Sequence, residues 1–161
     1  MEQMRSYSWH TTAESLAAAR GLSGFEYLQK LVAGELPPPP IASTMGFQLV
    51  ELTPGRAVFR LVPQEWHYNP IGTVHGGVLA TLCDSAMGCA VHSQLPLGTG
   101  YTTQELKTNY LRPLSKDSGE VRCVGEVLYL GNRQATAESK VFSSDGKLVA
   151  HSTTTCMILK G

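Results

Sequence analysis

Charged side chains are scarce in this sequence. Asp, Glu, Lys and Arg make up 16% of its 161 residues, against roughly 25% in an average soluble domain. Thirteen basic residues cancel thirteen acidic ones, so the formal net charge is zero. Nucleic-acid-binding proteins usually carry a basic excess, and its absence argues against that class. A chain with so little charge has to cover more of its surface, and we expect partner subunits to do so.

Long apolar runs are also absent. The longest weakly polar stretch, residues 78–97, contains an aspartate, a histidine and a proline, which makes it a poor membrane span. The first residues lack the apolar core of a secretory signal. The four cysteines are Cys83, Cys89, Cys123 and Cys156, with no Cys-x-x-Cys pair and no zinc-ligand spacing. We therefore expect a cytoplasmic protein with reduced thiols, no metal and no membrane contact.

The beginning of the chain has the pattern of an appendage. After a polar tail, Thr11 and Glu14 have the spacing of a capping box that opens a helix over about residues 13–33, weakened or kinked by two glycines. Four consecutive prolines then predict a stiff, extended spacer. The predicted division is a tail, helix and spacer in residues 1–40, and the main domain in residues 41–161.

The main domain alternates between strand-like runs and turn signals. The runs cover residues 47–52, 57–62, 101–111, 120–130, 134–143 and 147–159. Asp145-Gly146 is a strong hairpin signal between the last two. Short connections favour an antiparallel meander over a parallel sheet.

One segment, residues 78–94, does not fit the strands. It is rich in Ala, Leu, Cys, Met and Gly, and Asp84 is its single charged residue. A helix that is apolar all round is a buried helix. The sequence thus predicts an α+β fold, in which a long central helix is wrapped by five or six antiparallel strands, with an extra N-terminal helical arm.

Candidate chemistry gathers at the start of this helix. Gly76 and Gly77 stand directly before it, where the first backbone amides lack helical partners and lie at the positive end of the dipole. Without side chains, these glycines leave room for a carbonyl oxygen that gains negative charge. The alternative is a glycine-rich turn that only caps the helix.

Asp84 is the second candidate. An ionised carboxylate in an apolar helix is costly unless it is paired or hydrogen-bonded, and such a group beside a cleft is a candidate base or nucleophile. The alternative is a structural aspartate bonded to a neighbouring strand. Asp84 lies seven residues after Gly77, about 10 Å along the axis at ~1.5 Å per residue. One chain therefore does not bring both to one small group of atoms, whereas two helices related by a twofold axis can.

Residues 69–84, Asn-Pro-Ile-Gly-Thr-Val-His-Gly-Gly-Val-Leu-Ala-Thr-Leu-Cys-Asp, resemble the HGG motif of hotdog-fold acyl-CoA thioesterases. The resemblance is to the phenylacetate-pathway (PaaI-like) branch of the 4-hydroxybenzoyl-CoA thioesterase superfamily. It covers about residues 41–159 and leaves out the N-terminal arm. It implies a hotdog fold and a homodimer with shared sites, commonly paired into a homotetramer, with no metal and no cofactor beyond the coenzyme A of the substrate.

The same resemblance implies roles for single residues. Asp84 would be the nucleophile or general base, and the Gly77 amide would polarise the thioester carbonyl. Asn69 would orient the hydrolytic water or the thioester, and His75 would support the loop. Thr103, on the strand after the helix, stands where the family often has a Ser or Thr near the carboxylate, which is a weaker match. Taken alone, Asn69 and His75 are equally compatible with turn and capping roles.

Basic residues at predicted strand ends and turns are candidates for contacts with the phosphates of coenzyme A; these are Arg112, Lys116 and Arg133. The alternative for each of the three is a solvated charge at a strand end that binds no ligand. Gly76 would leave space for the substrate. The other histidines, His10, His67, His92 and His151, show no ligand spacing and are assigned structural roles.

Three candidate functions remain. Hydrolysis of acyl-CoA thioesters to free acid and coenzyme A is favoured, because one carboxylate and an oxyanion site suffice when a thiolate leaves. A hotdog acyl-thioester dehydratase needs a His and a carboxylate where this chain has Tyr68 and Leu82. A non-catalytic acyl-CoA-binding or sensor protein would not need Asp84.

Overall fold

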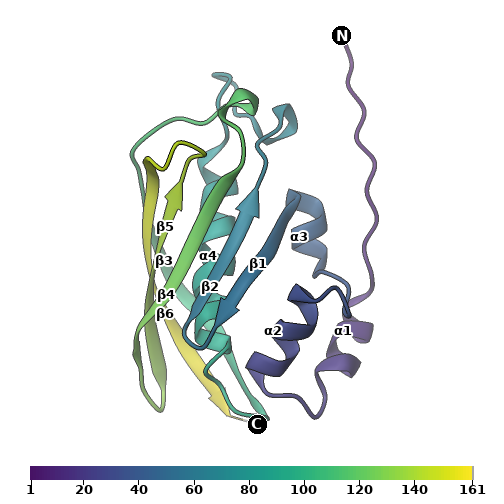
Figure 1. Cartoon of the computed structure of the whole chain (residues 1–161), viewed down its shortest axis with the longest axis vertical. Coiled ribbons are helices and arrows are strands. Elements are labelled where there is room, and N and C mark those ends of the chain that lie inside the picture. The colour runs from purple at the N-terminus through teal and green to yellow at the C-terminus, as the bar shows by residue number, and fades with distance from the viewer. Residues whose placement is uncertain (161) are drawn as a thin grey trace.

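One antiparallel sheet curls around a single long helix in the computed structural model, which describes residues 1–160 (Figure 1). The helix is α4 (Gly76–His92), and the strands are β1 (Phe47–Thr53), β2 (Arg56–Leu61), β3 (Thr99–Tyr110), β4 (Val121–Leu130), β5 (Gln134–Phe142) and β6 (Leu148–Lys160). Their order across the sheet is β1-β2-β4-β5-β6-β3, with every neighbouring pair antiparallel. The predicted α+β fold, with a central helix wrapped by antiparallel strands, is confirmed.

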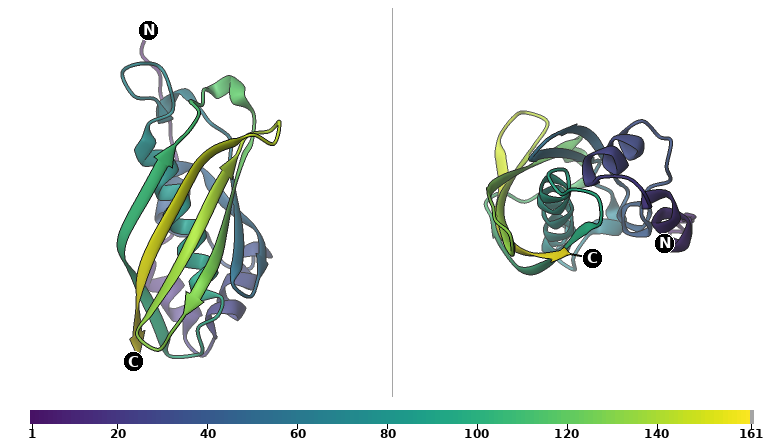
Figure 2. Two further views of the ribbon diagram at one scale, coloured as in Figure 1. Left: turned by 90° about the vertical axis from the view of Figure 1, so that its left-hand side faces the viewer. Right: turned by 90° about the horizontal axis from the view of Figure 1, so that it is seen from below.

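The sheet covers most of α4 but leaves one side of the helix without strands. β1 and β3 are the two edges of the sheet. Figure 2 shows the strands around the helix when it is viewed from below, with the N-terminal helices next to β1. The α4 residues on the side without strands, among them Thr81, Asp84, Ser85 and Cys89, are partly exposed.

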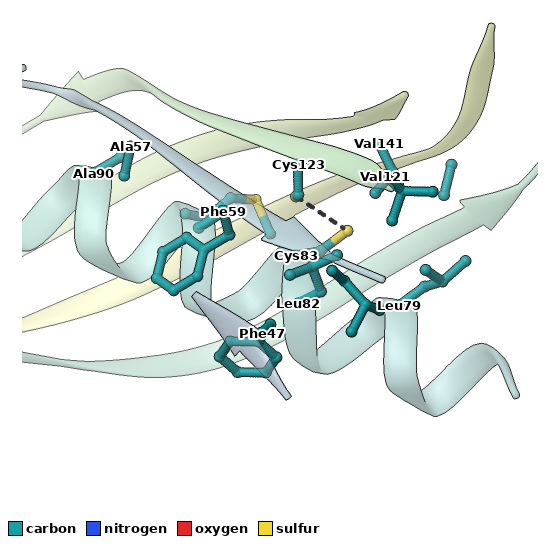
Figure 3. Close-up of a cluster of buried hydrophobic side chains, with 14 of the residues drawn as sticks. Phe47, Ala57, Phe59, Leu79, Leu82, Cys83, Ala90, Val121, Cys123 and Val141 are labelled. Carbon is teal, nitrogen blue, oxygen red and sulfur yellow. Dashed lines mark hydrogen bonds between the residues drawn. The ribbon is translucent and has the colours of Figure 1, made fainter. Parts of the chain in front are cut away.

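The opposite side of α4 forms the core together with the inner face of the sheet. Figure 3 shows Leu82 and Cys83 facing Val121 and Cys123 of β4. These four side chains have no exposed surface, and removal of such apolar surface from water is the main favourable contribution to folding. β4 comes very close to the helix at Gly125, where a Cβ would lie 2.4 Å from the Ala86 carbonyl. All four cysteines are free thiols.

The N-terminal arm differs from the single predicted helix. It contains α1 (Thr12–Ala19), α2 (Gly24–Val32) and α3 (Pro40–Met45). The chain leaves α1 through Gly21, whose φ of +81° is unfavourable for other residues, and α2 begins at a capping box.

The capping box was predicted at the wrong position. It is formed by Ser23 and Glu26, whereas Thr11 makes no side-chain cap bond. Of the four prolines expected in an extended spacer, Pro40 instead occupies the first turn of α3, where its fixed φ suits a helix.

The arm packs against the main fold rather than standing apart from it. Leu28 of α2 is 2% exposed, and the Gly24 N–H donates to the carbonyl of Leu95, just beyond α4 (3.2 Å). The tail before α1 is attached through the Arg5 guanidinium, which donates to the Thr44 carbonyl (2.6 Å) and stacks over the ring of Trp66. Such cation–π stacking adds to the attachment.

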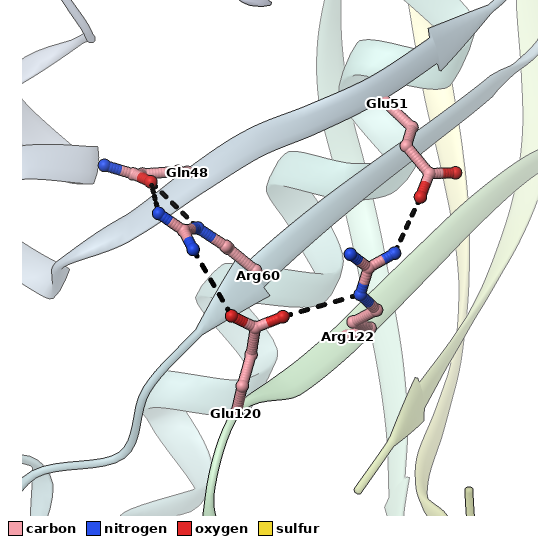
Figure 4. A network of polar contacts seen from close by, with 5 residues as sticks. All are labelled: Gln48, Glu51, Arg60, Glu120 and Arg122. Carbon is pink, nitrogen blue, oxygen red and sulfur yellow. Dashed lines mark hydrogen bonds and ion pairs between the residues drawn. The ribbon is translucent and has the colours of Figure 1, made fainter. Parts of the chain in front are cut away.

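The outer face of β1, β2 and β4 carries a network of polar side chains (Figure 4). Arg122 pairs with Glu51 (2.6 Å) and Glu120 (3.5 Å), and Arg60 pairs with Glu120 (3.4 Å) and Gln48 (2.6 Å). Exposed ion pairs contribute little to stability. The network makes the outer face of these strands polar.

None of the helices in residues 1–160 is long and apolar enough to cross a membrane.

Candidate active site

Asp84 lies near the middle of α4, on the side that the sheet does not cover. Its carboxylate Oδ1 accepts a hydrogen bond of 2.8 Å from the Thr103 hydroxyl on β3. No side chain or amide in the described part of the chain bonds to Oδ2. A half-buried carboxylate that is oriented through one oxygen and free at the other is suited to receive a proton or to attack a carbon.

The start of α4 differs from the prediction by two residues. The helix begins at Gly76 rather than at Val78, so both glycines lie in its first turn, and His75 is the N-cap residue. The His75 ring accepts the Gly77 N–H through Nδ1 at 2.9 Å, which requires that Nδ1 carries no proton. His75 itself donates its backbone N–H to the His67 carbonyl (2.7 Å).

These bonds decide which amide is available to a substrate. The Gly77 N–H was the predicted donor to the thioester carbonyl, but in this structure it is occupied by His75. The Gly76 N–H has no acceptor among residues 1–160. The free donor at the positive end of the helix is therefore the Gly76 amide, one residue earlier than predicted.

Asn69 holds the loop before the helix in shape. Its Oδ1 accepts the N–H groups of Ile71 (3.1 Å) and Thr73 (3.2 Å), and its Nδ2 donates to the Thr73 hydroxyl (3.0 Å). This is the pattern by which asparagine side chains stabilise turns. The structure thus gives Asn69 a turn role, and one hydrogen of its side-chain amide has no acceptor among residues 1–160.

A pocket of about 330 Å³ lies at the helix N-terminus and brings together Asn69, Gly76, Tyr110 and Arg112. Tyr110, at the end of β3, donates its hydroxyl to the Gly76 carbonyl (2.9 Å). A Cβ on Gly76 would come within 3.0 Å of the tyrosine ring. No sequence pattern marks Tyr110, because only the packing of β3 against α4 brings it to the glycine.

The three predicted basic residues do not form one cluster in a single chain. Arg112 lines the pocket, and Lys116 begins the short 3-10 helix η2 (Lys116–Ser118), which lies at the same end of the sheet in Figure 1. Arg133 lies at the other end. The Arg112 amide donates to Val149 and the Arg133 carbonyl accepts from Ile158, nine residues of β6 apart, or roughly 30 Å at ~3.3 Å per residue.

The catalytic candidates likewise fall into two groups. Gly76 and Asp84 are eight residues apart on one straight helix, or about 12 Å along its axis. Asp84 and Thr103 form one group, and the helix N-terminus with Asn69 and Tyr110 forms the other. No group of three or more His, Cys, Asp or Glu side chains within residues 1–160 is arranged to hold a metal ion.

A long central helix wrapped by one antiparallel sheet is the architecture of the hotdog fold. Comparisons with known proteins agree. Residues 71–150 match the Thioesterase superfamily. Human acyl-coenzyme A thioesterase 13 is 30% identical over 103 residues, which are 63% of this chain and 72% of that protein. The 1,4-dihydroxy-2-naphthoyl-CoA hydrolase of Listeria monocytogenes is 27% identical over 74% of this chain and 96% of its own length.

Solved structures give the same result. A conserved protein of Pseudomonas aeruginosa is 36% identical, with a TM-score of 0.71 over 76% of this chain and 95% of its own. The PaaI protein of Escherichia coli superposes with a TM-score of 0.74 over 88% of this chain and 98% of its own, at 21% identity, and so supports the fold alone. The chain belongs to the Thioesterase superfamily, and its named relatives include an acyl-coenzyme A thioesterase and a CoA-thioester hydrolase.

Proposed function

We propose that this chain hydrolyses acyl-CoA thioesters to the free acid and coenzyme A, in a site shared between two subunits. The observation that carries the proposal is the Asp84 carboxylate. It is held through Oδ1 by Thr103 at 2.8 Å, and its second oxygen is unpaired on the open side of α4. A protein that only binds acyl-CoA has no need of a carboxylate at this position.

In the proposed reaction the thioester carbonyl oxygen accepts the Gly76 N–H of one subunit. Asp84 of the other subunit removes a proton from water, whose oxygen attacks the carbonyl carbon. The negative charge that develops on the carbonyl oxygen is stabilised by the amide and the helix dipole. When the C–S bond breaks, the sulfur leaves as the thiolate of coenzyme A and takes up a proton.

A nucleophilic route uses the same groups. The free oxygen of Asp84 attacks the carbonyl carbon, the thiolate leaves, and water hydrolyses the resulting mixed anhydride to return the carboxylate. Single turnover in ¹⁸O-labelled water distinguishes the two. Direct attack by water puts the label only into the product acid, whereas the anhydride route can leave ¹⁸O in the Asp84 side chain.

The shared site rests on the separation between Gly76 and Asp84 and on the position of β3. This strand is an edge of the sheet and supplies Thr103, so a second copy related by a twofold axis has access to the Asp84 side of α4. We propose a homodimer that pairs into a homotetramer, works in the cytoplasm, and needs no metal or cofactor besides its substrate. Arg112 and Lys116 would bind the coenzyme A phosphates, and Arg133 would do so only from a partner subunit.

The test is release of thiol, measured with a thiol-reactive dye over a panel of acyl-CoA thioesters, with the product acid quantified in parallel. Equal amounts of thiol and acid support the proposal. Loss of water from 3-hydroxyacyl-CoA without thiol release would point to a dehydratase instead. Tight binding of acyl-CoA without any turnover would show a binding protein.

A further inference from the structure

A second cavity lies beneath the N-terminal arm and is separate from the pocket at the helix N-terminus. Its volume is about 900 Å³, within the usual range for small-molecule sites. The arm supplies one wall through the segment that joins α2 to α3, and β1 supplies the other. Cys89 of α4 is the only residue of the central helix that reaches it within the described chain.

The inner surface of the cavity is apolar. Phe47 and Phe59 of the sheet, 2% and 5% exposed, line it together with Leu36 of the arm and the partly buried Leu49. Its polar lining residues include the exposed His10, Glu35 and Gln48 and the partly buried Ser43. A hollow with aromatic and aliphatic walls and mostly exposed polar residues fits a hydrocarbon chain better than a charged or strongly hydrogen-bonding ligand.

The cavity comes close to the proposed reaction centre. Cys89 lies five residues after Asp84 on α4, about 7.5 Å along the axis and roughly 140° around it, and the partly exposed Ser85 lies between them. Burial, with a smaller contribution from the charge of Asp84, raises the pKa of the Cys89 thiol to about 12. The thiol is therefore in an apolar environment close enough to the carboxylate for that charge to affect its pKa.

Tyr101 closes the alternative direction. Its ring covers α4 on the β3 side, so closely that a Cβ on Gly88 would lie 2.3 Å from the tyrosine hydroxyl. A chain that extends from Asp84 toward the C-terminal end of the helix meets this ring on the β3 side. To reach the cavity, the chain has to pass Ser85 and Cys89.

We propose that this cavity binds the aliphatic chain of a medium- or long-chain acyl-CoA, and that the N-terminal arm is the element that sets the preference for chain length. The acyl-CoA substrate in this proposal rests on the proposed hydrolysis, but binding of an aliphatic chain to the cavity can be measured without any hydrolysis. A single aromatic ring would fill a small part of 900 Å³, whereas each additional buried methylene strengthens binding by about fourfold.

The first test compares kcat/KM for saturated acyl-CoA substrates from two to sixteen carbons. We expect a rise of up to about fourfold per methylene once the chain passes Cys89. Leu49→Trp fills part of the cavity from the sheet side, and Leu36→Trp fills part of it from the arm side. Each should lower kcat/KM for dodecanoyl-CoA at least tenfold and change kcat/KM for acetyl-CoA less than twofold. Val62→Trp, which adds the same bulk at an exposed position outside the cavity, is the control.

A binding measurement separates this proposal from the proposed hydrolysis. Dodecanoate is titrated by calorimetry into Asp84→Asn and into Asp84→Asn combined with Leu36→Trp. Dodecanoate binding that the tryptophan weakens at least tenfold supports the cavity as the site of the acyl chain. This holds even if the wild-type protein hydrolyses no thioester, because that result would overturn only the proposed hydrolysis. If dodecanoate does not bind, or if the folded tryptophan variants keep the full chain-length profile, the cavity is not the acyl site, whatever the enzyme hydrolyses.

Discussion

The imidazole of His75 accepts the N–H of Gly77 at 2.9 Å, and this bond separates two tasks that lie side by side at the start of α4. His75 with Gly77 caps the helix, as a side-chain acceptor at the N-cap does in general. Gly76, between them, has the unsatisfied amide that a substrate oxygen can use. The His-Gly-Gly sequence thus combines a cap and a candidate oxyanion donor in three residues.

Gly76→Pro tests the donor with little disturbance of the backbone. Proline suits the first helical position, and His75 already has the extended conformation (ψ 136°) that a following proline requires. Without the amide, turnover should fall by about 10²–10³.

Gly76→Ala is the matched control for this variant, because it keeps the amide but brings the same Cβ within 3.0 Å of the Tyr110 ring. The two variants are compared by thiol release at saturating substrate. Equal activity of the proline and alanine variants would exclude the Gly76 amide. Gly77→Pro, which removes the amide that His75 occupies, should reduce stability by about 1 kcal/mol through loss of the cap, with a smaller effect on turnover than Gly76→Pro.

Asp84→Asn should retain the fold and reduce thioester hydrolysis by about 10²-fold or more, the scale expected when a positioned base is lost. The amide can still accept the Thr103 hydrogen bond, so the loss reports on the carboxylate rather than on packing. Asp117→Asn, an exposed carboxylate in η2, should have normal activity. Near-normal turnover of a folded Asp84→Asn protein would contradict both proposed roles of this residue.

Thr103 should matter through its hydroxyl alone. Thr103→Val removes the donor to Asp84 and preserves shape, and it should lower kcat about 10- to 100-fold, the range for hydrogen bonds to charged groups. Thr103→Ser keeps the donor and should keep most of the activity. The comparison is read from kcat with thermal unfolding as a check on folding. If valine and serine behave alike, the 2.8 Å bond has no part in the reaction.

The sequence was sufficient for the regular parts of this fold. Period-two alternation and turn residues such as Asp145-Gly146 located the strands, because side chains in a strand alternate between core and solvent. Asp84 was recognisable because a lone carboxylate in an apolar helix requires an explanation. The start of α4 was harder to predict from the sequence, since His75 is not among the residues that usually mark an N-cap.

Other features depended on contacts between distant segments. Tyr110 meets Gly76 across 34 residues of sequence, and no local pattern indicates that pair. The position of Arg133, far from Arg112, follows from the pairing of β5 and β6 along their whole length. The arm was predicted as one helix because Gly21 lowers helix stability only modestly in an average context, whereas here a capping box at Ser23 makes two helices the better solution.

Acid should destabilise the protein through its buried histidines. Burial lowers the pKa of His92 and of His67 from the ordinary value of 6.5. As pH falls below about 6.5, the unfolded chain binds protons that the folded chain does not, so the free energy of unfolding decreases until the lower folded pKa is reached. His92→Phe keeps an aromatic ring beside Tyr27 and Tyr101, and should lose less thermal stability than wild type between pH 7.5 and 5.5.

The exposed Trp9 supplies the control for this experiment. Trp9→Phe changes an aromatic ring that carries no titratable group and should leave the acid dependence of Tm unchanged. The two melting series are recorded by circular dichroism in the same buffers. A His92→Phe protein whose Tm falls with acid as steeply as that of wild type would mean that this histidine is not protonated upon unfolding in that range.

The shared site can be tested by complementation, because Gly76 and Asp84 are separated along one helix. Asp84→Ala and Gly76→Pro should each be nearly inactive alone. When equal amounts are unfolded and refolded together, half of the dimers are mixed. Each mixed dimer has one site with both lesions and one site that combines an intact Gly76 from the first variant with an intact Asp84 from the second. Under twofold symmetry a quarter of all sites is then intact, and about a quarter of wild-type activity should return.

Subunit exchange has to be shown independently, for instance by native mass spectrometry with a mass tag on one variant. Two variants with lesions in the same half-site, Asp84→Ala and Thr103→Val, provide the matched control. A mixed dimer of these two has one lesion in each of its sites, so mixing them should restore nothing. With exchange shown, absence of recovery in the first mixture would place both groups in one chain. Because 12 Å of helix separates them there, Asp84 and the Gly76 amide would then have to act in different steps or on different ligands.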